Sequence, residues 1–128
     1  MSLISVIKDF FEIKIDIVTR DNDNYIFIDA FIKSRKVGEL RALFENDKAL
    51  LADIIIHERN INKGIGTKLI TKFEELCIEK GVSVITGNLA NVDLNHKDRL
   101  IHFYLKNKYE IIYENEEKLY WGKIIKHL

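Results

Sequence analysis

The sequence predicts an α/β domain with a mixed β-sheet, its elements following the order βββ(β)-α-β-α-ββ. Three observations predict this class. The first half of the chain has the two-residue period of strands, its middle changes to the period of an amphipathic helix, and a second apolar strand follows that helix. The 128 residues contain no proline, few glycines and no low-complexity tract that would mark a linker, so we expect residues 1–128 to form a single domain.

The first half of the chain is predicted to form strands joined by short polar turns. Residues 11–19 alternate apolar and polar side chains, and residues 20–24 follow with turn-forming Asp and Asn. Residues 25–33 and 37–45 are two further strands, and the short polar break between them indicates a hairpin. Asn46 and Asp47 are expected to turn the chain once more.

The middle of the chain is predicted to form a βαβ unit. Residues 49–57 are a nearly continuous apolar run, as expected for a central strand covered on both faces. From Gly64 the apolar residues recur at helical spacing, and Gly81 ends this helix. Residues 82–86 form a second apolar strand. Because a helix connects the two strands, they should run parallel.

The last part of the chain supplies one helix and two strands. A polar stretch at residues 87–95 leads into a helix over about residues 96–107. Residues 109–113 and 119–125 are two terminal strands, and residues 114–117 should be the turn between them.

Composition excludes several classes of partner. Twenty Lys plus Arg balance twenty Asp plus Glu, so no net field attracts nucleic acid or an anionic membrane. Cys77 is the only cysteine, which rules out an internal disulfide and a cysteine-rich metal site, and we expect no metal. No stretch approaches the ~20 apolar residues of a spanning helix. We therefore expect a cytoplasmic protein with a small ligand.

Residues 61–67 form a turn between an apolar strand and an amphipathic helix. Free N–H groups of the first helical turn and the helix dipole favour an anion there, and Lys63 and Thr67 add a charge and a hydroxyl donor. An isolated Gly-x-Gly is also typical of an ordinary helix start. The Walker pattern would need Lys directly after Gly66, and the dinucleotide fingerprint would need glycine where Leu69 stands.

Two segments resemble the GNAT superfamily of acetyl-CoA-dependent N-acetyltransferases. Residues 57–70 are similar to its acetyl-CoA-binding segment, Arg/Gln-x-x-Gly-x-Gly/Ala, and residues 103–109 to its Tyr-x-x-x-Gly-Phe signature. The resemblance covers about residues 37–113 and implies a GNAT-like fold. It also implies that an acetyl group moves from acetyl-CoA to an amine of a small molecule or peptide, by direct attack. Ile61 stands where the family has Arg or Gln.

The resemblance also assigns roles to particular residues. The phosphates of the cofactor would lie on the turn Ile61, Asn62, Lys63, Gly64, Ile65, Gly66 and Thr67, and the pantetheine would pair with the backbone of Ile54, Ile55 and Ile56. Asn91 belongs to a polar stretch near the expected exit of the cofactor, although loops and helix caps use the same residue types.

Tyr104 corresponds to the family's general acid, which protonates the departing thiolate. Taken by itself, Tyr104 would be a partly buried aromatic on a helix face. An ammonium acceptor must first lose a proton, and Asp53, His57 and Glu58 are the nearby groups that could take it. Asp53 can equally be read as a hydrogen-bonded structural carboxylate, and His57 as an ordinary surface residue.

The family usually has two helices after its first strand, where this chain has only residues 20–24. The acceptor site should therefore be open or completed by another chain, and exposed terminal strands make a homodimer plausible. Two other functions stay open at this point. One is a non-catalytic acyl-CoA-binding or regulatory domain, and the other is an interaction module that binds no nucleotide. The sequence does not identify the acceptor.

Overall fold

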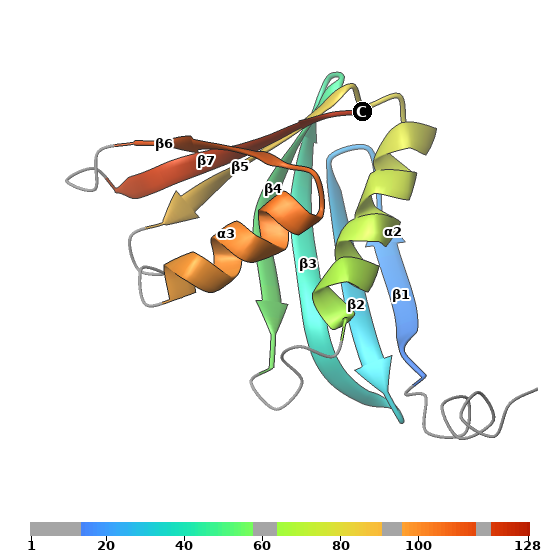
Figure 1. Cartoon of the computed structure of the whole chain (residues 1–128). Coiled ribbons are helices and arrows are strands. Elements are labelled where there is room, and N and C mark those ends of the chain that lie inside the picture. Colours follow the sequence, from blue (N-terminus) through green and yellow to red (C-terminus); the bar gives the residue numbers. More distant parts are fainter. Residues whose placement is uncertain (1–13, 58–63, 91–95, 115–118) are drawn as a thin grey trace, which may run out of the picture.

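The computed structural model describes residues 14–57, 64–90, 96–114 and 119–128 (Figure 1). Seven strands form one mixed sheet in the order β1-β2-β3-β4-β5-β7-β6, and two helices, α2 and α3, lie on the same face of it (Figure 1). The elements are β1 (Asp16–Asp21), β2 (Tyr25–Ile32), β3 (Arg35–Glu45), β4 (Lys48–Ile56), α2 (Ile65–Glu79), β5 (Val84–Ala90), α3 (Lys97–Lys106), β6 (Glu110–Tyr113) and β7 (Tyr120–His127). This is the predicted α/β class and the predicted element order.

Strands β1 to β4 form an antiparallel meander with tight turns. The β2–β3 turn consists of Lys33 and Ser34, both with positive φ (49° and 66°), as a two-residue hairpin requires. Strand β3 consequently begins at Arg35, two residues before the predicted start. The predicted first turn was also placed too early, because β1 continues through Asp21. Asn22 makes that turn: its Oδ1 accepts the backbone N–H groups of two following residues at 2.8 and 3.0 Å.

The direct connection from β1 to β2 confirms that no helical pair separates these strands. Beneath α2, the inward-facing residues of β2 and β3 are opposed across the strands, Ile28 against Leu40 and Ala30 against Gly38. Gly38 leaves room for the helix, since a Cβ there would lie 3.0 Å from Ile65 Cγ2. The helix covers this face with fully buried side chains, namely Leu69, Ile70, Phe73 and Cys77. The core thus lies between α2 and the meander.

Strand β4 departs from its prediction as a central strand covered on both faces. Ala49 and Leu51 are buried, but Ala52, Asp53 and Ile55 are exposed. The register with β3 explains the change. Arg41 faces Asp53 while the next residue of β3 faces Leu51, so Ala52 is an extra, bulged residue in β4. A bulge bends the strand and ends regular pairing.

The bulge coincides with the end of the β4–β5 ladder. The two strands pair in parallel, as predicted for the βαβ unit, but only from Lys48 against Val84 to Leu51 against Gly87. Beyond these pairs the strands separate, as Figure 1 shows. Strand β5 continues to Ala90, so the prediction that residues 87–90 belong to a polar loop was wrong. Strand β5 pairs antiparallel with β7 along its whole length, and the local sequence of residues 87–90 gives no sign of this pairing.

Candidate functional site

The separation of β4 from β5 leaves a row of backbone groups on β4 without a strand partner. The N–H of His57 donates to the carbonyl of Val37 in β3 at 3.0 Å. Because backbone groups alternate in direction along a strand, those of Ile54 and Ile56 point the other way, toward the gap beside β5. Among the described strands none pairs with β4 there. We call this gap the β4–β5 slot. An extended ligand could pair with its β4 edge as an added strand does.

The start of helix α2 presents a second set of unused donors. The first intrahelical bond runs from the N–H of Lys68 to the carbonyl of Gly64 at 3.1 Å, so the N–H groups of Ile65, Gly66 and Thr67 have no partner within the helix. Among the described residues no side chain caps this end, and the first turn of the helix contains no acidic residue. Gly64 itself has φ of 78°, a conformation that favours glycine. These donors and the helix dipole form an anion site.

The slot and the start of α2 open onto one cavity of about 400 Å³. Strand β4 contributes Ile54 and Ile56, whose side chains point to the helix face of the sheet. The other described lining residues come from two helices. Those from α3 are Arg99, Leu100, His102, Phe103 and Lys106, and those from the start of α2 are Gly64, Ile65, Gly66 and Thr67.

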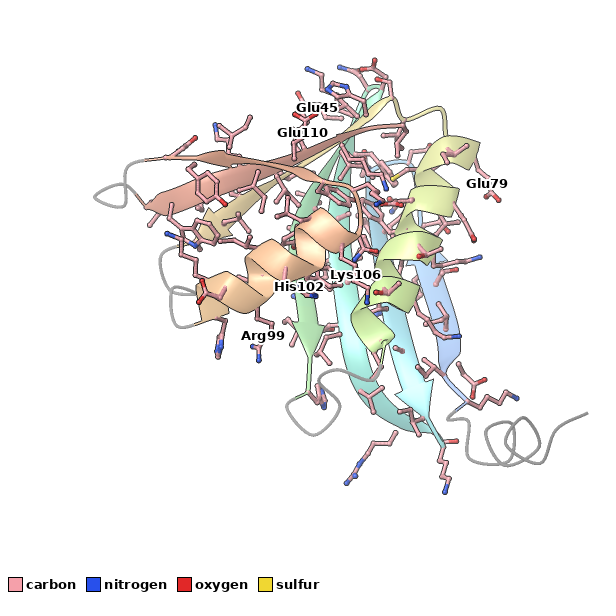
Figure 2. The ribbon with its side chains drawn as sticks, viewed as in Figure 1. Glu45, Glu79, Arg99, His102, Lys106 and Glu110 are labelled. Carbon is pink, nitrogen blue, oxygen red and sulfur yellow. The ribbon has the colours of Figure 1, made fainter. Side chains whose placement is uncertain are left out.

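Three of the residues from α3 are basic, and they follow one side of the helix. Arg99, His102 and Lys106 are spaced three and four residues apart, and in Figure 2 Arg99 and His102 lie below α3 while Lys106 lies at the end of α3 nearest α2. Glu45, Glu79 and Glu110 lie away from these residues, in the upper part of the view. Among the described residues no acidic side chain lines the cavity. Attraction for an anion is therefore not offset locally.

From the sequence alone, His96, Lys97 and Arg99 are expected chiefly as a solvated helix start, although they could also reach the adenosine phosphate of the cofactor. His102 and Lys106 were not among the predicted residues. The signal was available, because residues spaced by three or four share a helix face. What the sequence could not supply was the direction of that face. Lys97, considered together with Arg99, lies instead over the ring of Trp121, with its Nζ 4.9 Å from the ring centroid.

The cavity is held in shape by a contact between its two helices. A Cβ on Gly66 would lie 2.8 Å from Cε1 of Phe103, so only glycine at position 66 allows the Phe103 ring to pack against the first turn of α2. The sequence interpretation gave the glycines of the turn the role of admitting an anion. For Gly66 the structure adds a packing role.

Tyr104 lies on another side of α3, in the core. It is 5% exposed and is absent from the described cavity lining. Its ring makes edge-to-face contacts with Phe103 and Tyr109, with centroids 5.2 and 5.7 Å apart. This placement matches the purely structural interpretation of Tyr104, and its role as general acid stays a prediction.

Tyr109, which stands where the GNAT signature has phenylalanine, joins a polar cluster behind the cavity. Its hydroxyl donates to Oε2 of Glu74 at 2.8 Å, and the Nζ of Lys126 donates to both Glu74 oxygens at 3.0 Å. Lys126 also donates to the carbonyl of Asn107 at 2.9 Å, at the end of α3. Burial, and then the charge of Glu74, raise the pKa of Tyr109, so it stays protonated. The cluster ties α2 to the end of α3 and to β7.

Two of the three predicted bases, Asp53 and His57, lie on the opposite face of the sheet from the cavity. Asp53 pairs with Arg41 across the strands and is exposed, and His57 is exposed just beyond β4. Ile55 shares this face and is 42% exposed. Glu58, Ile61, Asn62, Lys63 and Asn91 lie outside the described residues.

Two other properties bear on function. Within the described residues no group of three His, Cys, Asp or Glu side chains is placed to hold a metal ion. No helix in the described part of the chain is long and apolar enough to cross a membrane.

Comparison with known sequences gives a family match over most of the chain. The acetyltransferase (GNAT) family matches residues 4–109. A Bacillus subtilis protein, uncharacterized protein YocC, is 29% identical over 77 residues, which are 60% of this chain and 45% of that protein. The chain thus spans less than half the length of this relative.

Comparison with solved structures identifies the same fold. PaiA N-acetyltransferase from Thermoplasma acidophilum, solved with coenzyme A, superposes with a TM-score of 0.72 at 19% identity, covering 82% of this chain and 62% of that one. An IAA acetyltransferase from Bacillus cereus gives 0.70 at 15% identity, covering 90% and 100%. A Bacillus anthracis protein in complex with acetyl coenzyme A gives 0.70 at 17% identity, covering 84% and 65%.

Proposed function

The chain belongs to the acetyltransferase (GNAT) family, and on this premise we propose that it moves an acetyl group from acetyl-CoA to an amine of a small molecule or peptide. One observation carries the proposal. The unpaired β4 edge at Ile54 and Ile56 and the uncapped start of α2 open onto the same cavity. An extended chain of amides ending in a diphosphate would need both features, in this order along one path.

The described donors fit acetyl-CoA, which when bound supplies an acyl group activated as a thioester. The backbone of Ile54 and Ile56 would pair with the pantetheine amides, and the N–H groups of Ile65, Gly66 and Thr67 would hold the diphosphate. The path between these two groups of donors is covered by apolar side chains, which limit its contact with water. These are Ile54 and Ile56 from β4, and Leu100 and Phe103 from α3.

In the transfer itself, the amine nitrogen bonds to the acyl carbon while the carbon–sulfur bond breaks. The N–H of Ile56 points into the slot and would donate to the carbonyl oxygen as charge develops on it. One well-aimed donor of this kind is worth ~3 kcal/mol in the barrier. The nitrogen loses a proton, and the departing thiolate takes one up.

The amine would approach from the face of the sheet opposite the two described helices. Asp53 and His57 lie on this face beside the slot, opposite the cavity. Either could therefore take the proton of the amine without competing for space with the cofactor. Tyr104 remains our proposed proton donor to the thiolate, and its burial in the core makes this the role most in need of a test.

A second candidate function is binding of acyl-CoA without catalysis. Two observations favour it. Tyr104 does not line the described cavity, and the direct β1–β2 connection leaves the acceptor side without the wall that a helical pair would form. In that case the domain would respond to acyl-CoA by a change in stability or in its interactions, not by turnover.

Two measurements test the proposal and separate the candidates. Thermal unfolding with acetyl-CoA, CoA and ATP should show stabilisation by the first two only, because a ligand that binds the native state raises Tm. A thiol-release screen over amines should then find an acceptor. Stabilisation without thiol release for any amine would support the binding domain. No stabilisation by either CoA compound would contradict both candidates.

If turnover is found, Tyr104→Phe distinguishes the proton donor from a core residue. A loss of kcat of about 10²-fold or more with unchanged CoA affinity supports the catalytic role. Unchanged kcat would assign Tyr104 to packing alone. The variant keeps the ring that packs against Phe103 and Tyr109, so its fold should be retained.

A further inference from the structure

The basic side of α3 carries more charge, over a greater length, than a diphosphate alone would use. We call Arg99, His102 and Lys106 the α3 basic face. Arg99 and Lys106 are seven residues apart, which at 1.5 Å per residue places them roughly 10 Å apart along the helix. Phe103 lies between them and packs on Gly66. The α2 amides therefore face the middle of this row, with one permanent cation toward each end.

The two permanent charges of this face have no carboxylate partner in the part of the chain that the structure describes. Within the described parts of the chain, no ion pair involves Arg99 or Lys106. The half-buried Lys36 and Lys126 do have carboxylate partners, whereas Arg99 and Lys106 are exposed at the mouth of the cavity and remain available to a ligand. Two cations that line one cavity without an acidic neighbour repel each other weakly, and an anion between them would remove that cost.

A diphosphate held by the α2 amides would lie opposite only the centre of the α3 basic face. A cation about one helical turn to either side could contact a second anionic group of the same ligand, joined to the diphosphate by a spacer. CoA has such a group, because its ribose carries a phosphate monoester in addition to the diphosphate. Dephospho-CoA has the same pantetheine and diphosphate but lacks the monoester.

We propose that the α3 basic face binds the ribose phosphate of CoA, so that the protein selects CoA over dephospho-CoA. This inference rests on the proposed use of the cavity for acetyl-CoA. It goes further by assigning a specificity role to the cation at the end of the face that the ribose phosphate reaches, either Arg99 or Lys106. In this chain α3 would then add charge for the cofactor beside that of Lys63, since the turn before α2 has Ile61 in place of the family's Arg or Gln.

The test is a titration of the full chain with CoA and with dephospho-CoA, measured calorimetrically at fixed salt. For the unaltered protein we expect CoA to bind at least about tenfold more tightly, the effect of one good charge-assisted contact. The ribose phosphate can lie at only one end of the face, so we expect one of the variants Arg99→Gln and Lys106→Gln to lower CoA affinity with dephospho-CoA affinity nearly unchanged, and the other to change both affinities equally. In the double variant the preference should fall close to one.

Lys48→Gln is the matched control. It removes one exposed positive charge at the far end of β4 and should leave the preference intact. Equal affinities in the unaltered protein, or an unchanged preference in the double variant, would overturn the inference while leaving the proposed function standing. Failure to bind either compound would overturn the proposed function, and the inference with it. Circular dichroism of each variant confirms that the fold is retained.

Discussion

The ring of Phe103 in α3 lies against Gly66 in the first turn of α2, so closely that a Cβ on Gly66 would be 2.8 Å from the ring. This contact joins the two helices that line the cavity. One carries the free amides and the other carries the basic side chains. The distance between the two walls of the site is therefore set by a glycine and an aromatic ring.

Gly66→Ala should destabilise the protein and weaken CoA binding together. The added methyl group overpacks the contact, which typically costs ~1–3 kcal/mol and here would also push α3 away from α2. Urea denaturation and calorimetric titration measure the two effects. Phe103→Leu in the same chain should recover part of both, because the smaller side chain leaves room for the methyl. An alanine variant as stable and as tight-binding as the original would show that the helices adjust freely.

Gly64→Ala should affect binding through the backbone alone. Gly64 has φ of 78° and a Cβ there would meet nothing within 4 Å, so the cost is conformational, about 1 kcal/mol. Gly81, at the other end of α2, provides a close control with φ of 79° and equally open surroundings. Both alanine variants should lose similar thermal stability. Only the change at Gly64 should weaken CoA binding, and equal effects on binding would argue against an anion site at that turn.

The direction of the backbone at β4 can be tested with proline. Ile56→Pro removes an N–H that points into the slot, whereas Ile55→Pro removes one that points toward β3. We expect the first variant to lower acetyl-CoA affinity and any turnover about tenfold or more, and the second to lower mainly stability. Ile56→Val keeps the N–H with a smaller side chain and separates loss of the donor from loss of packing. The reverse pattern would mean that the β4 edge is not used.

Cys77 should be unreactive in the native protein. The side chain is fully buried, and burial together with the nearby charge of Glu74 raises the pKa of the thiol to about 12. A thiol reagent should modify Cys77 only after unfolding. Rapid modification of the native protein at pH 8 would contradict the buried placement. The result also matters in practice, because a thiol-release assay would otherwise count this residue.

The same shift makes stability depend on pH. The folded-state pKa of Cys77 lies above the reference value of 9.0, so between pH 9 and 12 the unfolded chain releases a proton that the folded chain keeps. Stability is then lost as pH rises through this window, by up to ~1.4 kcal/mol per pH unit. Denaturation at pH 9 and pH 10 should show a larger loss for the original protein than for Cys77→Val. Equal losses would exclude this contribution.

Much of the fold could be predicted because it is encoded locally. Alternation along residues 25–33 and 37–45 and the helical period after Gly64 reflect which neighbouring side chains must share a buried face. The parallel β4–β5 pairing followed from the helix between the strands. Boundaries were less secure. Residues 87–90 have the composition of a loop, and their strand conformation comes mainly from pairing with β7, thirty or more residues away.

The sequence by itself determined the α/β class, the order of the elements and the strand-to-helix turn at Gly64, because each depends on contacts between residues close in the chain. Tertiary structure alone decided where β4 and β5 separate, which side of α3 lines the cavity, and that Tyr104 turns toward the core. These features arise from the bulge in β4, which shifts its register with β3, and from the packing of α3 against Gly66. Such contacts join distant segments, and a periodicity read along the chain carries no information about them.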